Sequence, residues 1–181
     1  MLRYVHAVLV RMTRSGPDAA WDVVGDTCSV QAKRGGALTG MNPTDRGKPG
    51  TKYHIVVSAD GLPLAVAPSP ANVHDSKALS GSAARGPGRL RRHRQALRGR
   101  GYDRANNRWL CLRDGVQPHS RKVGEPHGSG LGTVRCIVEH GCTWPLANKR
   151  LDRRQDRLQR MILALLTAAA FFIVANRLSA F

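Results

Sequence analysis

The sequence predicts an α/β fold built on a sheet of mixed strand direction. β-Branched residues are concentrated in two early segments, residues 21–32 and 51–70, and helical patterns follow later in the chain. Strands that first form a meander and then alternate with helices are typical of a mixed sheet covered by helices. The 181 residues, 41% of them hydrophobic, suffice for one domain with a real core. We therefore expect one mixed sheet flanked by helices, with a helical segment at the C-terminus.

Three strands and a short helix are expected in the first half. The segment WDVVGDTCSVQA, Trp21–Ala32, reads as a strand, and a loop punctuated by glycine and proline follows it. The next two strands flank Asp60-Gly61, a turn signal of a β-hairpin. A short helix is expected over Asn72–Leu79, capped by its first residue with an acid, Asp75, three residues on.

The second half predicts strands alternating with helices. Behind a linker rich in glycine, proline and arginine, the expected order is a strand over Ala96–Gly101, a helix over Arg104–Arg113, a strand over Val116–Lys122, and helix from Thr133 onward with a break at Pro145. The break is expected because an interior proline costs a helix about 3 kcal/mol or more.

The chain shows no sign of export. Residues 1–14 have no uninterrupted apolar core and no small-residue cleavage site after it. The four cysteines form no CxxC pair, which favours a reducing compartment. The apolar run Met161–Ala175 has fifteen residues, fewer than the roughly 20 of a membrane helix. We expect a cytoplasmic protein without a membrane partner, its C-terminal helix buried, although the flanking Arg160 and Arg177 also fit an interfacial anchor.

Positive charge dominates the chain, with 29 basic and 12 acidic residues and a formal net charge of +17. Such a balance indicates a polyanionic partner. Ten arginines lie between residues 85 and 113, and six basic residues lie between 149 and 160. A solvated surface would explain one such run, whereas two favour nucleic acid, because the arginine fork suits phosphate oxygens. Candidate phosphate contacts in the first run are Arg91, Arg92, Arg94, Arg100 and Arg104.

The loop after the first strand offers Arg46, Lys48 and Lys52, which would either contact phosphates or solvate a hairpin.

Two acids also stand out in so basic a chain. Asp26 lies in the first strand, and Glu139 lies in the helical segment VRCIVEH. Enzymes that cut phosphodiesters commonly hold two Mg²⁺ ions with acids from separate elements. Two acids suggest such a site without establishing it.

Several ordered segments resemble one known family. KRGGALTGMNPTDRGKPGTKYHIVV, GLPLAV, NVHDS, RGYD, HGSGLGTVR and IVEH are similar to bacterial insertion-sequence transposases of the DDE class, and most similar to the actinobacterial type of the insertion-sequence five family. The resemblance implies an RNase H-like fold and a metal-dependent endonuclease, using Mg²⁺ or Mn²⁺, that cleaves and joins double-stranded DNA at transposon ends and targets. A homodimer is among the assemblies it implies. Asp26 matches the first catalytic, metal-binding aspartate, and Glu139 matches the glutamate.

The second catalytic aspartate has no counterpart. In the family it belongs to the motif Ala-Asp-Arg-Gly-Tyr-Asp, which this chain replaces with Arg98-Gly-Arg-Gly-Tyr-Asp103, so that Gly99 stands at the catalytic position. One base change converts an aspartate codon to glycine. Asp103 lies four residues further on, about 13 Å away along a strand, which is outside a metal's coordination shell.

The resemblance begins near Trp21, which divides the chain into an N-terminal remnant, residues 1–20, and a DDE catalytic domain, residues 21–181. Family members usually carry a helical DNA-binding segment ahead of the first catalytic strand. We therefore expect a truncated, impaired copy of a transposase. The alternative is a catalytically inactive remnant that only binds DNA.

Overall fold

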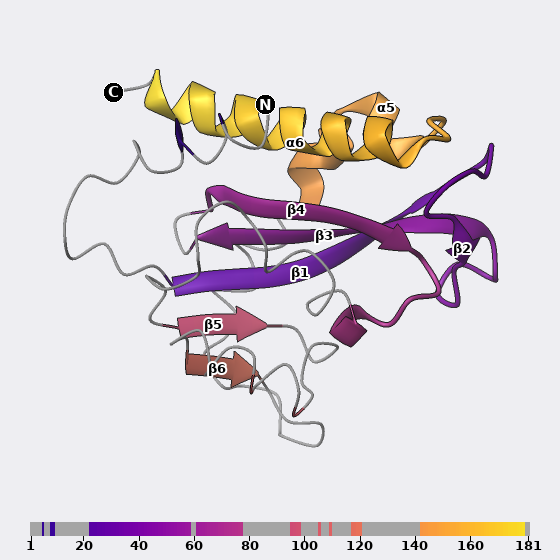
Figure 1. Cartoon of the computed structure of the whole chain (residues 1–181), viewed down its shortest axis with the longest axis horizontal. Coiled ribbons are helices and arrows are strands. Elements are labelled where there is room, and N and C mark those ends of the chain that lie inside the picture. Colours follow the sequence, from indigo (N-terminus) through magenta and orange to yellow (C-terminus); the bar gives the residue numbers. More distant parts are fainter. Residues whose placement is uncertain are drawn as a thin grey trace.

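The computed structural model of the protein describes residues 22–58, 61–77, 95–98, 117–120 and 142–179, together with the single residues 5, 8, 9, 105 and 109. Its centre is a six-stranded sheet in which β2, β3, β1, β5 and β6 follow one another, with β4 also paired to β3 (Figure 1). Helices α5 and α6 lie on one face of this sheet. The predicted mixed sheet with a C-terminal helix is confirmed.

Strand β1, Asp22–Gln31, runs through the middle of the sheet. It pairs antiparallel with β3, Pro49–Ser58, and parallel with β5, Gln95–Arg98. Strand β6, Gln117–Ser120, continues the parallel half beside β5. The strands expected around residues 96–101 and 116–122 are thus present in the described parts of those segments. The central strand is the one on which the sequence placed its first catalytic acid.

The predicted hairpin is confirmed as β3 and β4, Pro63–Pro70. Its turn closes when the Ser58 N–H donates to the Leu62 carbonyl at 2.9 Å and the Gly61 N–H donates to Ser58 O at 2.7 Å. Gly61 has φ of 82°, which glycine adopts without steric cost. The two-residue strand β2, Gly40–Met41, pairs with the start of β3.

Helix α6, Gln159–Leu178, covers β4 (Figure 1). Its buried residues recur every fourth position, at Ile162, Leu166, Ala170 and Val174, which puts one apolar stripe against the sheet. At 20 residues the helix is longer than its apolar run suggested. Among the described residues it is the one helix whose length and composition would allow a membrane crossing, and 28% of its apolar window is buried inside the structure.

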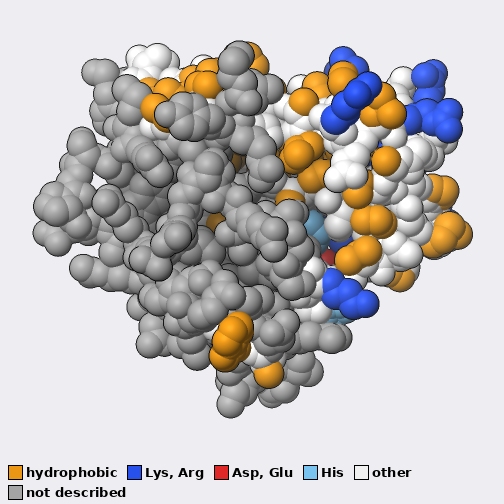
Figure 2. Space-filling model, viewed as in Figure 1, with side chains coloured by type: hydrophobic (Ala, Val, Ile, Leu, Met, Phe, Trp, Pro, Cys, Tyr) orange, Lys and Arg blue, Asp and Glu red, His pale blue; other side chains and the backbone are white. Residues whose placement is uncertain are grey.

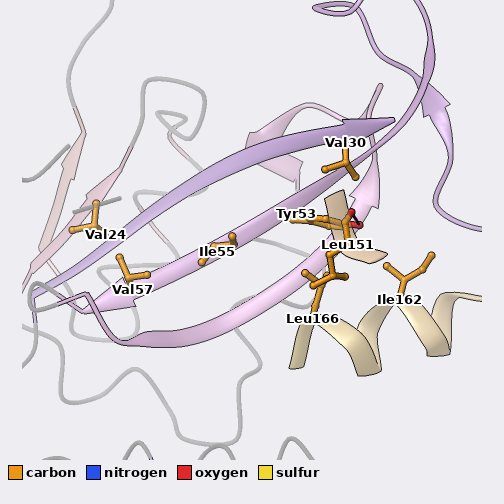
Figure 3. Packing of buried hydrophobic residues seen from close by; sticks show 8 residues of the cluster. All are labelled: Val24, Val30, Tyr53, Ile55, Val57, Leu151, Ile162 and Leu166. Atoms are coloured by element: carbon orange, nitrogen blue, oxygen red, sulfur yellow. Dashed lines mark hydrogen bonds between the residues drawn. The ribbon is translucent and has the colours of Figure 1, made fainter. Parts of the chain in front are cut away.

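The core lies between the sheet and the two helices (Figure 3). It combines Val24 and Val30 of β1, Tyr53, Ile55 and Val57 of β3, Leu151 of α5 (Lys149–Asp152), and Ile162 and Leu166 of α6. The Tyr53 hydroxyl donates to the Leu151 carbonyl at 3.0 Å and so ties α5 to the central sheet. Burial raises the pKa of Tyr53, which keeps the phenol protonated as a donor.

Two local expectations were wrong. Residues 142–147 are helical through the buried Pro145, and the break comes at Asn148, whose side chain caps α5 by accepting from the Arg150 N–H at 3.0 Å. Asn72 lies in a turn, and the helix starts at residue 75. The Asn72 side chain packs directly on Gly40 of β2, so this tertiary contact removes it from capping.

Candidate active site around Asp26

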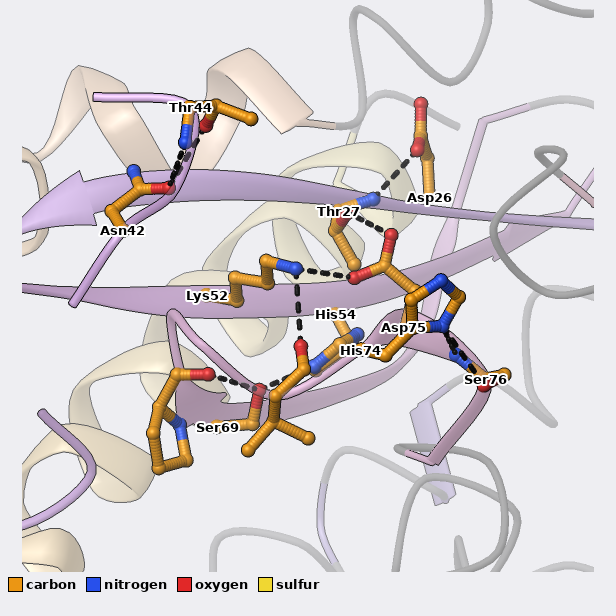
Figure 4. Close-up of polar contacts among 12 residues, drawn as sticks. Asp26, Thr27, Asn42, Thr44, Lys52, His54, Ser69, His74, Asp75 and Ser76 are labelled. Carbon is orange, nitrogen blue, oxygen red and sulfur yellow. Dashed lines mark hydrogen bonds and ion pairs between the residues drawn. The ribbon is translucent and has the colours of Figure 1, made fainter. Parts of the chain in front are cut away.

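Asp26 occupies the middle of the central strand. It shares its face of β1 with Val24 and Val30, because side chains alternate along a strand, and this is the face that the helices cover. The carboxylate is half-buried, and its Oδ1 accepts a hydrogen bond from the Thr27 N–H at 2.8 Å. Figure 4 shows Asp26 and Thr27 projecting to opposite sides of the strand. One backbone donor thus orients an acid on the central strand.

The end of β5 lies next to Asp26. In the parallel pair, Val24 is opposite Leu97 and Gly25 is opposite Arg98. Position 99, Glu139 and Asp103 lie outside the described residues, so the structure places only the first of the predicted metal-binding acids. Within the described part of the chain, no three His, Cys, Asp or Glu side chains gather into a metal site.

The opposite face of β1 carries a polar network that the sequence did not predict. Lys52 Nζ lies 2.9 Å from Asp75 Oδ1 and donates to the Val73 carbonyl at 3.1 Å (Figure 4). The Thr27 hydroxyl donates to Asp75 Oδ2 at 3.4 Å. The Lys52 side chain is only 16% exposed, so its ammonium fastens the 73–75 segment beneath β1. The sequence pointed to Asp75 only as the acid of a helix cap and as part of the NVHDS segment of the resemblance, and neither signal indicated Lys52 as its partner.

His54 lies beside this network on β3. It is buried, and its Nε2 lies 2.7 Å from the Ser69 hydroxyl on β4. Burial lowers the pKa of His54 to about 4; the charge of Asp75 raises it and the charge of Lys52 lowers it further. The imidazole is therefore neutral at neutral pH and joins two strands as a hydrogen-bonded core residue.

Arg46 and Lys48 sit on a closed turn after β2. The Asn42 N–H donates to the Lys48 carbonyl, and the Asn42 carbonyl accepts from the Gly47 N–H, each at 2.9 Å. Arg46 is exposed and has φ of 50°, a left-handed conformation that is uncommon for residues other than glycine. Lys48 is also exposed, 3.6 Å from Asp45. Lys52, the third phosphate contact predicted for this loop, is instead paired with Asp75. The remaining predicted contacts, Arg91, Arg92, Arg94, Arg100 and Arg104, lie outside the described residues.

Comparison with known proteins identifies the family of this chain. The sequence profile described as "Transposase DDE domain" matches residues 7–171. The chain belongs to this family. A candidate transposase for insertion sequence element IS402 of Burkholderia cepacia is 39% identical over 155 residues, which cover 81% of this chain and 73% of that protein. The predicted resemblance to insertion-sequence DDE transposases is confirmed at this level, while membership of the insertion-sequence five family stays a prediction.

A solved structure shares the fold of this DDE domain. It is a chain of the simian T-cell lymphotropic virus intasome in complex with the PP2A regulatory subunit B56 gamma, with a TM-score of 0.51 and 16% identity. The match covers 88% of this chain and half the length of the other. The RNase H-like fold that the sequence predicted is thereby confirmed. DDE proteins generally use a divalent metal ion, as expected from the resemblance.

Proposed function

We propose that this chain serves DNA transposition with an active site that has lost its second metal-binding carboxylate, so that it binds DNA and cuts it poorly. The observation that carries the proposal is the register of β1 and β5. Gly25 pairs with Arg98, and the next residues along the two parallel chains are Asp26 and Gly99. Neighbouring strands lie about 4.8 Å apart, and one peptide unit advances the chain by about 3.8 Å. On this basis we assign Gly99 to the place of the missing acid.

Strand parity supports the same assignment. Residues directly opposite one another in neighbouring strands project to the same face of a sheet. If the pairing extends by one residue, a side chain at position 99 shares the face of Asp26. An aspartate there would bring a second carboxylate to the site, whereas Gly99 brings none.

Carboxylate oxygens are suitable ligands for Mg²⁺ or Mn²⁺, so Asp26 fits the cation that the family generally uses. In our proposal Asp26 and Glu139 would hold it. When bound, this cation supplies the activation of the attacking oxygen in phosphodiester chemistry. The chain's own contribution is orientation. The Thr27 N–H fixes the Asp26 carboxylate, and the Lys52–Asp75 pair secures the strand from its other face.

The proposed substrate is double-stranded DNA at insertion-sequence ends. Arg46 and Lys48 are exposed on a turn whose backbone is closed by hydrogen bonds, which reduces the entropy lost when they meet phosphates. We assign phosphate contacts to these two residues and to Arg91, Arg92, Arg94, Arg100 and Arg104. Lys52 is not among them, because its ammonium is paired with Asp75. We further propose that two copies act together as a homodimer, which light scattering of the DNA complex tests.

The salt dependence of binding tests the DNA-binding part. If about six phosphates are neutralised, the logarithm of the association constant for a duplex should fall with the logarithm of salt concentration with a slope near −5. A salt-independent affinity, or no binding at low salt, would contradict it. The second candidate function, an inactive DNA-binding remnant, is favoured by Gly99. Metal-dependent nicking of transposon-end DNA, abolished by Asp26→Ala, would exclude it.

We propose a cytoplasmic location, where the DNA substrate is found. The packing of α6 on β4 supports this, because the helix uses its apolar stripe within the fold. The full chain should stay in the supernatant without detergent and should not sediment with vesicles of neutral lipid. Sedimentation with such vesicles would assign α6 to a membrane instead.

A further inference from the structure

Two basic segments far apart in the sequence meet beyond the end of β1. Lys33 and Arg34 follow that strand, and residues 153–160 form the connection from α5 together with the first two residues of α6. The Ala37 N–H donates to the Arg157 carbonyl at 2.8 Å. Gly36 lies so close to the backbone of Arg157 that a β-carbon would overlap it. The loop after β1 is therefore packed against the 153–160 segment.

Arg154 fixes this junction from inside. Only 2% of the residue is exposed, and its guanidinium reaches oxygen atoms of both segments. Its Nη1 donates to the hydroxyls of Thr39, at 2.9 Å, and Thr51, while Nη2 donates to the Ala37 carbonyl. Its Nε donates to the Asp156 carbonyl at 3.1 Å. All these acceptors are neutral oxygens. Arg154 therefore holds the junction through carbonyl and hydroxyl groups and not through a carboxylate partner.

The junction exposes five basic side chains that we call the basic end: Lys33, Arg34, Arg153, Arg157 and Arg160. Figure 2 shows lysine and arginine side chains gathered where α5 meets the start of α6. In the described part of the chain, none of the five has a carboxylate partner. The neighbouring Arg150 differs, because Asp156 accepts two hydrogen bonds from it, at 3.0 and 2.8 Å.

We propose that the basic end is a second DNA-binding surface, which holds the phosphate backbone of the duplex whose end lies at Asp26. This inference rests on the proposed function. Asp26 and Gln31 are five residue steps apart along β1, about 17 Å at roughly 3.3 Å per residue. That distance corresponds to about five base pairs at about 3.4 Å each, so one straight duplex can reach both places. Exposed lysines and arginines without carboxylate partners hold phosphates without reading the base sequence.

The test compares two double variants of the full chain. Lys33→Ser with Arg157→Ser removes one charge from each half of the basic end. Lys77→Ser with Arg177→Ser removes the same charge from other elements. Binding to a 20-base-pair duplex is followed by fluorescence anisotropy at several salt concentrations. The first variant should reduce the magnitude of the salt slope by about 2 and weaken binding roughly ten- to fifty-fold at 100 mM salt, and the control should keep the wild-type slope.

Each other outcome counts against the proposal. If the wild type binds DNA and the basic-end variant keeps its slope, this surface is not used, although the proposed function stands. If the wild type binds no DNA at low salt, both fail. Vesicles containing phosphatidylserine supply a further arm, because exposed Leu158 and Met161 adjoin the basic end. Loss of vesicle binding with unchanged DNA binding would assign the surface to anionic lipid.

Discussion

Replacing Arg154 with methionine should destabilise the fold and release the loop after β1. Methionine keeps an unbranched apolar stem but removes five hydrogen bonds, to the carbonyls of Gly35, Ala37 and Asp156 and to the hydroxyls of Thr39 and Thr51. Water can replace the donor at the carbonyls of the exposed loop, but not at Thr51, which is fully buried, and less easily at half-buried Thr39. Two bonds to a charged group, at about 1.5 kcal/mol each, give a loss of about 3 kcal/mol.

Urea unfolding and thermal unfolding, both followed by circular dichroism, measure this loss of stability. A change of about 3 kcal/mol should lower Tm by roughly 6–12 °C in a chain of this size. Arg150→Gln is the matched control, because Arg150 contacts the same segment from the surface. Its side chain is 57% exposed, so solvent screens its ion pair with Asp156, which should contribute less than the buried bonds of Arg154. If the Arg154→Met protein unfolds at the same urea concentration as the wild type, the buried arginine does not hold the junction. The basic end would then not be held in place by Arg154.

Three further changes test the network around the site. Burial lowers the pKa of His54 to about 4, so the unfolded chain binds more protons than the folded one between about pH 6.5 and 4. The free energy of unfolding should therefore fall by about 3 kcal/mol as the pH drops through this window. In urea titrations the His54→Gln protein should lack this pH dependence, and a retained dependence would refute the assignment. Tyr53→Phe should cost about 1–2 kcal/mol because the Leu151 carbonyl loses its donor, and an unchanged urea midpoint would contradict this. A double-mutant cycle with Lys52→Met and Asp75→Asn should give a coupling energy of about 1 kcal/mol, and additive effects would show that the pair does not act together.

Local patterns predicted the parts of the fold that local physics determines. Trp21–Ala32 reads as a strand because it is rich in β-branched residues, and Asp22–Gln31 is one. The hairpin follows from Asp60-Gly61, since the left-handed backbone that its turn requires is cheap for Gly61. The misplaced cap at Asn72 shows the limit, because a contact with Gly40, distant in the sequence, outweighed a good local signal.

The candidate site also has parts that the sequence could predict and parts that it could not. Asp26 could be found because its position in a β-rich segment matched a family motif, and the structure places it on the central strand. The partners of Lys52 and Arg154 could not be found, since 23 residues separate Lys52 from Asp75 and 103 separate Arg154 from Thr51. A charge run shows that cations are present, but only the fold determines which are buried, which are paired and which are left for DNA.

The affinity for Mn²⁺ of the wild type and of Gly99→Asp, measured by titration calorimetry, tests the central claim most directly. Both proteins must first give matching circular dichroism spectra, because the substitution adds a charged side chain beside β5. A third carboxylate near Asp26 and Glu139 should strengthen Mn²⁺ binding at least about tenfold, equivalent to about 1.4 kcal/mol. Asp26→Ala in the Gly99→Asp background should abolish the gain. Equal affinity in two folded proteins would contradict the claim that Gly99 occupies the place of the missing acid.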